Sequence, residues 1–195
     1  MANYCDYSMC IQGPAPNVEE VIKSVKGHYD YDTMKFDHKS HLTRVFESDI
    51  MEDTTTKGIR KVVIDGYCAW SVYSCMLSGL NTYYNSLKEE YGDESRATTL
   101  EELSREHNVS IEVYGSEQGD GFQEHYAFIH GEMYIDEVTD FEALYEDGYD
   151  DKEEFQDDLN ELKERYGEEG RKIGDDICFG GFPNWDFAPF EYIQV

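Results

Sequence analysis

The opening of the chain places a strand directly before a helix, which restricts the fold to classes that combine helices with a sheet. Apolar and polar residues alternate over residues 3–12, so this segment is predicted to be a half-buried strand. Its buried face consists of Cys5, Tyr7, Met9 and Ile11. Residues 13–16 (GPAP) should end the strand, and Asn17 is then a suitable helix N-cap with Glu20 at the capping-box position. Gly27 should end this helix. The apolar face of the helix is Val18, Val21, Ile22 and Val25.

The middle of the chain is less regular. Residues 29–36 suggest a short strand or a packed loop, and apolar residues spaced over 42–50 suggest a short helix. The apolar run at 61–77 predicts a buried strand through 62–64 and 67–72, with a bulge near Gly66. A helix is expected near residues 81–91.

The following segments are better defined. Thr99 and Glu102 form a capping-box pattern for a helix over 100–106. Alternation then predicts three strands, at 109–114, 122–129 and 133–137. The order of elements indicates an α+β fold with helices on one face of a sheet.

The net charge constrains the partners of the protein. The chain has 43 acidic and 16 basic residues, a formal charge of −27, and residues 138–195 contribute −13 of it. Such a charge disfavours direct binding to nucleic acid or to anionic lipid, because both need basic residues to neutralise phosphate. It favours a cationic partner, since it would steer one in. A halophilic origin would explain the same composition.

One acidic helix is predicted near the end of the chain. Phe155, Leu159, Leu162 and Tyr166 recur at the spacing of one helical stripe, and the rest of the helix is rich in carboxylates. Over about 18 residues, or about 27 Å, eight carboxylates give about one charge per 3.4 Å. That spacing is close to the phosphate spacing of a single DNA strand. The simpler interpretation is a solvated helix that keeps the protein soluble.

An aromatic tail follows the acidic helix. We expect it to pack back on the domain, although a homodimer contact would hide it equally well. Its aromatic residues are Phe179, Phe182, Trp185, Phe187, Phe190 and Tyr192. The chain is thus expected to divide into an α+β domain at 1–137 and an acidic helical extension with its tail at 138–195.

No motif for metal, cofactor or catalysis is recognisable. The pair His38 and His41 lacks a third ligand at zinc-like spacing, and no EF-hand pattern is present. Nucleophile elbows, Walker loops and dinucleotide fingerprints are also missing, so no enzyme is predicted and no cofactor is expected. The five cysteines form no CxxC pair. Together with the lack of a long apolar run, they predict free thiols and a cytoplasmic protein without a membrane segment.

Two stretches resemble a known family. The opening MANYCDYSMCIQGP and the segment 111–132 (IEVYGSEQGDGFQEHYAFIHGE) are similar to the YubB-type ferredoxin-like family of phage and plasmid proteins, as is Ala69-Trp70-Ser71. Tyr4 stands where that family usually has tryptophan. The resemblance covers residues 1–137 and implies a ferredoxin-like antiparallel sheet and a mobile-element origin. It implies no catalytic residues.

These observations lead to one main hypothesis. The protein is expected to be a phage or mobile-element inhibitor that imitates nucleic acid and occupies the basic channel of a host defence enzyme, with a CRISPR effector nuclease as the favoured example. The enzyme would be met in the cytoplasm of a bacterial host. The residues expected to make the contact are Asp147, Asp150, Asp151, Glu153, Glu154, Asp157, Asp158, Glu161 and Glu164.

Two alternatives remain open. One is a small enzyme or an RNA-binding module that uses the ferredoxin-like sheet, in the second case with Tyr7, Tyr114 and Tyr126 as stacking rings. The other is a soluble phage accessory protein whose acidity confers only solubility.

Overall fold

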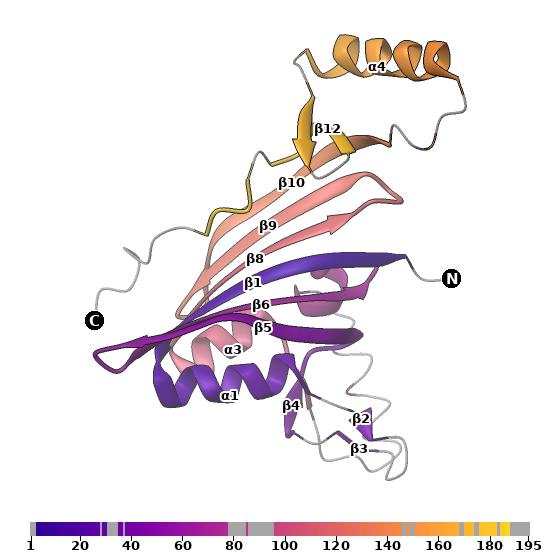
Figure 1. Cartoon of the computed structure of the whole chain (residues 1–195). Coiled ribbons are helices and arrows are strands. Elements are labelled where there is room, and N and C mark those ends of the chain that lie inside the picture. Colours follow the sequence, from indigo (N-terminus) through magenta and orange to yellow (C-terminus); the bar gives the residue numbers. More distant parts are fainter. Residues whose placement is uncertain are drawn as a thin grey trace.

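The fold is α+β, as the sequence predicts, and is built on one large antiparallel sheet (Figure 1). The predicted helix near 81–91 lies outside the described residues except for Asn85. The computed structural model describes residues 3–27, 29–30, 35–36, 38–77, 85, 96–145, 148, 151–167, 170–173, 176–182 and 184–187.

The large sheet has eight strands in the order β11-β12-β10-β9-β8-β1-β6-β5. Strand β1 is central, because it pairs with β6 on one side and with β8 on the other. The sheet is larger than the ferredoxin-like sheet expected from the sequence. Its strands are β1 (Tyr4–Pro14), β5 (Val45–Thr56), β6 (Ile59–Ala69), β8 (Ser110–Glu117), β9 (Phe122–Ile129), β10 (Glu132–Tyr145), β11 (Arg171–Ile173) and β12 (Asp176–Gly180).

Smaller elements complete the described chain. Two short ladders pair β2 (Tyr29–Asp30) with β3 (Lys35–Phe36) and β4 (Ser40–His41) with β7 (Arg96–Ala97). The helical elements are α1 (Ala15–Val25), the π-helix η1 (Tyr73–Leu77), α3 (Leu100–His107) and α4 (Lys152–Tyr166).

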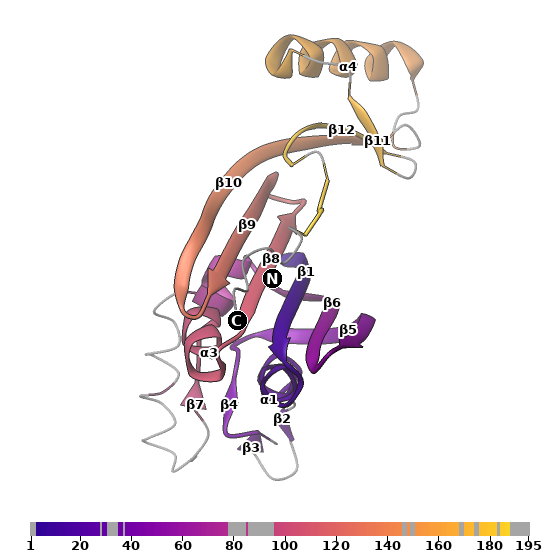
Figure 2. The same cartoon turned by 90° about the vertical axis from the view of Figure 1, so that its left-hand side faces the viewer.

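Helices α1 and α3 cover one face of the sheet, whereas α4 lies apart at its far end (Figures 1 and 2). The main core forms between the sheet and these two helices, where the expected apolar faces of β1 and α1 are buried. Burying one Val, Leu, Ile, Met or Phe side chain contributes about 1.5–3 kcal/mol, so this layer is the chief source of stability. No described helix is both long enough and apolar enough to cross a membrane.

The junction between β1 and α1 differs from the prediction. Strand β1 continues through Pro14, which pairs with Ile59, so residues 13–16 do not break it. Helix α1 begins at Ala15, and therefore Asn17 is not its N-cap. Its Nδ2 donates instead to the carbonyl oxygen of His107 at 2.7 Å and ties α1 to the end of α3. By contrast, the capping box of Thr99 and Glu102 is confirmed at the start of α3.

The helix expected over 42–50 is wrong, because residues 45–56 form the edge strand β5. The register of β5 against β6 shifts twice, between Val45 and Glu47 and between Ile50 and Glu52. At each shift β5 has one extra residue relative to β6, which interrupts the alternation of side chains between the two faces of the sheet. The apolar residues of this exposed strand consequently fall at spacings that imitate a helix. The bulge predicted in β6 near Gly66 is wrong, because β6 pairs with β1 without a register shift there. The nearest shift lies in β5, opposite Tyr67 and Cys68.

Candidate functional site

Helix α4 packs on residues 141–145 of β10 and on β12 through a small second core. We call α4, residues 141–145, β11 and β12 together the α4 lobe. The predicted stripe on α4 is confirmed: Leu162 is buried, and the other three residues pack around it. Their partners are Leu144 from β10 and Ile177 and Phe179 from β12. Asp151 caps the helix by accepting from the amide of Glu153 at 2.8 Å, and Gly167 ends it in the left-handed conformation. Most carboxylates of α4 are thereby left exposed, whereas Asp158 and Glu161 line a cavity between α4 and β10.

The structure places seven of the nine carboxylates predicted to bind a partner, whereas Asp147 and Asp150 lie outside the described residues. Asp151 serves as the helix cap and Asp158 is half-buried. Besides Asp151, the exposed ones are Glu153, Glu154, Asp157, Glu161 and Glu164.

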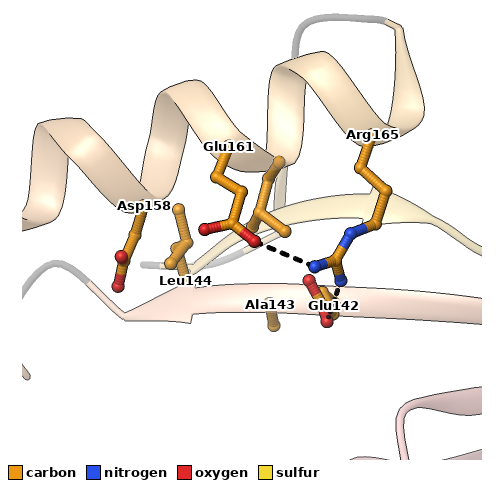
Figure 3. Close-up of a pocket in the computed structure, with 7 residues that line it drawn as sticks. Glu142, Ala143, Leu144, Asp158, Glu161 and Arg165 are labelled. Atoms are coloured by element: carbon orange, nitrogen blue, oxygen red, sulfur yellow. Dashed lines mark hydrogen bonds and ion pairs between the residues drawn. The ribbon is translucent and has the colours of Figure 1, made fainter.

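One arginine reduces the charge of this surface. Arg165 donates to Glu161 at 3.0 Å and to Glu142 of β10 at 2.6 Å, beside a cavity of about 320 Å³ under α4 (Figure 3). The two carboxylates raise the pKa of Arg165, with Glu142 the larger cause. Apart from the helix cap Asp151, four exposed carboxylates make no ion pair with any described residue, and we call these four the acidic face of α4. They are Glu153, Glu154, Asp157 and Glu164.

A second polar group lies on the open face of the sheet, opposite α1 and α3. His125 of β9 approaches Glu112 with Nε2 at 2.9 Å and Glu137 with Nδ1 at 3.6 Å. The Tyr114 ring stacks on the imidazole at 3.9 Å. Both imidazole nitrogens of His125 therefore lie beside carboxylates.

The aromatic tail lies across this group. Trp185 is parallel to the Tyr114 ring at 5.9 Å, and Phe182 and Phe187 approach the same ring edge-on. Two hydrogen bonds anchor the tail, from the Phe182 amide to Gln123 and from the Tyr114 hydroxyl to the carbonyl oxygen of Asp186. The described tail therefore covers the β8–β9 part of the open face. Phe190 and Tyr192 lie outside the described residues.

The sequence analysis did not identify the Glu112–His125 pair. The register of the β8–β9 hairpin would have indicated this pair. Tyr114 lies opposite His125 and Glu112 lies opposite Ala127, so Glu112 and His125 are diagonal neighbours. Residues diagonal to one another across two strands lie within reach of long side chains. Two of the three proposed stacking rings were misplaced as well, since Tyr7 and Tyr126 point into the main core.

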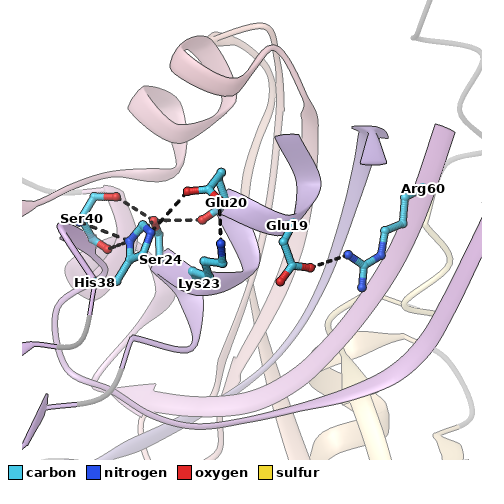
Figure 4. Close-up of polar contacts among 7 residues, drawn as sticks. All are labelled: Glu19, Glu20, Lys23, Ser24, His38, Ser40 and Arg60. Carbon is cyan, nitrogen blue, oxygen red and sulfur yellow. Dashed lines mark hydrogen bonds and ion pairs between the residues drawn. The ribbon is translucent and has the colours of Figure 1, made fainter. Parts of the chain in front are cut away.

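The histidines considered as metal ligands have other roles. His38 Nδ1 lies 2.9 Å from the Ser40 carbonyl oxygen, and its Nε2 lies 3.5 Å from Glu20 on α1 (Figure 4). His41 is buried. Within the described part of the chain, no three His, Cys, Asp or Glu side chains are arranged to hold a metal ion. The five cysteines are free and buried, as predicted, and burial raises the pKa of Cys10 to about 12.

A buried carboxylate makes stability depend on pH. Glu124 accepts from the amides of Val72 and Tyr73 and from the Tyr126 hydroxyl, and burial raises its pKa above the ordinary 4.5. Its contribution to stability is therefore complete below pH 4.5 and is lost as the pH rises through the raised value in the folded protein. The free energy of unfolding, relative to that of Glu124→Gln, should fall over this range in urea titrations between pH 4 and 8. A difference between the two proteins that is independent of pH would contradict this assignment.

Comparisons with protein-family models, with curated proteins and with solved structures find no match to this chain. The functional interpretation therefore rests on the residues and their geometry.

Proposed function

We propose that this protein is an inhibitor that binds a basic nucleic-acid-binding enzyme through the acidic face of α4. The observation that carries the proposal is the set of four exposed carboxylates, unpaired within the described residues, on a helix set apart from the main sheet (Figure 1). A cationic channel built for phosphate offers the charge complementary to such a helix.

The structure changes the expected charge spacing. From Glu153 to Glu164 the helix rises about 16 Å, so four charges are spaced at about one per 4–5 Å. This is looser than the 3.4 Å predicted for the whole helix, because Arg165 neutralises Glu161 and Asp151 caps the helix. The acidic face of α4 would thus engage selected phosphate positions of the channel, not every position in a row.

We also propose a mobile-element origin and a ferredoxin-like centre for the sheet. If the short elements β2, β3, β4, η1 and β7 are left out, the elements β1-α1-β5-β6-α3-β8 alternate as β-α-β-β-α-β, and their strands lie in the order β8-β1-β6-β5. This arrangement supports the resemblance to the YubB-type family, with β9 to β12 as additions. The proposed partner would be a host defence enzyme in the bacterial cytoplasm, and a CRISPR effector nuclease is the first class to test.

The first experiment is a pull-down of the tagged protein from nuclease-treated bacterial lysate at increasing salt. A basic nucleic-acid enzyme that is captured at low salt and lost at high salt supports the proposal, because salt screens exposed charges. Capture that resists salt would assign the contact to an apolar surface. The absence of any captured enzyme would favour the accessory protein whose acidity serves solubility.

Reversal of the acidic face of α4 tests the site itself. The variant E153K/E154K/D157K/E164K should bind the captured enzyme at least about 100-fold more weakly, because attraction becomes repulsion in the channel. Its far-ultraviolet circular dichroism should be unchanged, since all four side chains are exposed. The measurement is a titration by biolayer interferometry.

A matched pair of variants separates the site from the overall charge. E154K/D157K on α4 and E132K/D140K on β10 change the net charge equally, and all four positions are exposed. Only the first variant should weaken binding strongly. Equal losses in both would mean that the net charge alone attracts the enzyme.

A further inference from the structure

An exposed aromatic cluster lies on the open face, at the end of the sheet where β1 begins. Tyr4 of β1, Tyr67 of β6 and Phe46 of β5 contact one another with ring centroids 5.5–6.0 Å apart. Tyr4 is 63% exposed and Phe46 49% exposed, although large aromatic rings are usually buried. Exposed apolar groups that form a contiguous patch with a polar rim mark interaction sites.

The rim of this cluster is acidic. Asp6 is directly opposite Tyr67 across β1 and β6, and Asp49 is directly opposite Asp65 across β5 and β6. Like charges that face each other across a sheet destabilise it. Ser8 donates to Asp65 at 2.6 Å, but no described lysine, arginine or histidine forms an ion pair with these three carboxylates. The arrangement leaves negative charge that a cation from outside would neutralise.

The same end of the sheet shows how a guanidinium group binds such a surface. Arg44 places its guanidinium carbon 3.9 Å from the centroid of the Trp70 ring. The Ala69 amide donates to the Arg44 carbonyl oxygen, which sets this pair at the end of the β5–β6 hairpin beside the cluster. A planar guanidinium group can stack on an aromatic ring and donate to carboxylates at the same time.

We propose that Tyr4, Phe46 and Tyr67, with Asp6, Asp49 and Asp65, form a docking surface for arginine side chains of a protein partner. The rings supply flat faces for the guanidinium groups, and the carboxylates accept their hydrogen bonds. Lysine fits less well, because its ammonium group is a strongly hydrated point charge without a planar face. Nucleic acid is disfavoured by the same carboxylates. This surface is separate from the acidic face of α4 and does not depend on the proposed inhibition.

Calorimetric titration of the full chain with a nonapeptide of arginine and with a nonapeptide of lysine tests the proposal. The arginine peptide should bind about five- to tenfold more tightly than the lysine peptide at physiological salt. Y4A/F46A should remove this preference, and D49N/D65N should weaken binding of the arginine peptide by a similar factor. Both variants change side chains on the sheet surface, and their thermal unfolding should confirm a folded protein.

The controls separate this surface from general charge attraction. Y134A/Y145A removes two exposed rings on β10 and should leave the preference for arginine unchanged. E153Q/E154Q on α4 should weaken both peptides equally. Equal binding of the two peptides, or a preference for arginine that survives Y4A/F46A, would overturn the proposal. Neither result would affect the charge-reversal test on α4.

Discussion

Replacing Gly66 by alanine should destabilise the protein by at least about 3 kcal/mol, at the upper end of what overpacking in a core costs. A Cβ atom at this position would overlap the Glu47 carbonyl oxygen and would lie 2.8 Å from the Tyr7 hydroxyl oxygen. The Tyr7 ring crosses β6 at Gly66, and its hydroxyl lies 2.8 Å from Ser48 Oγ on β5. Because the overlap involves backbone on one side and a buried ring on the other, neither can move freely. Chemical denaturation of both proteins provides the measurement.

Gly58→Ala is the matched control. Gly58 lies in the turn between β5 and β6 with φ of +84°, and an added Cβ would meet no atom within 4 Å. Only the left-handed backbone conformation opposes alanine there, at a cost of about 1–2 kcal/mol. Equal losses of stability in the two variants would show that the space around Gly66 is not the limiting factor.

Leu162→Ala should unfold the α4 lobe while the main sheet stays folded. Leu162 belongs to a small apolar cluster whose buried members, among the described residues, are Leu144, Leu162 and Phe179. Removing a leucine from a core costs about 2–5 kcal/mol, which is large for a core of this size. Hydrogen exchange should show lost protection in α4 and retained protection in β1, β6 and β8.

This substitution also separates structure from charge in the proposed function. Leu162→Ala changes no carboxylate, yet it should abolish binding that depends on an ordered acidic helix. Glu164→Ala removes one exposed charge and should leave the protection of α4 intact. Loss of protection throughout the sheet in Leu162→Ala would mean that the lobe and the main domain unfold as one unit.

Local patterns in the sequence were sufficient for several elements. The alternation in β1, the apolar face of α1 and the stripe on α4 appear in the structure, because each reflects burial on one side of a single element. The capping box of α3 appears as well, because its hydrogen bonds join residues only three apart. The strand β9 was also predicted within its observed bounds.

The remaining differences come from contacts between distant segments. The two register shifts in β5 depend on its pairing with β6, so no local pattern indicates them. Strand β10 was expected to end at residue 137 but continues to Tyr145, because its second half pairs with β12. In the candidate site, the exposure of Glu153, Glu154, Asp157 and Glu164 followed from the apolar stripe. The i,i+4 pair of Glu161 and Arg165 is likewise a local pattern. The second contact of Arg165 is not, because Glu142 comes from β10.

The central place of β1 has a consequence for synthesis on the ribosome. This strand needs β6 on one edge and β8, which begins at Ser110, on the other. Both edges of β1 therefore stay unpaired until these strands have been synthesised, at about 5–20 residues per second. Contacts between segments so far apart also slow folding, because a long loop must close first. We expect the nascent chain to expose an apolar strand for several seconds, and chaperones that shield such strands should increase the yield of folded protein.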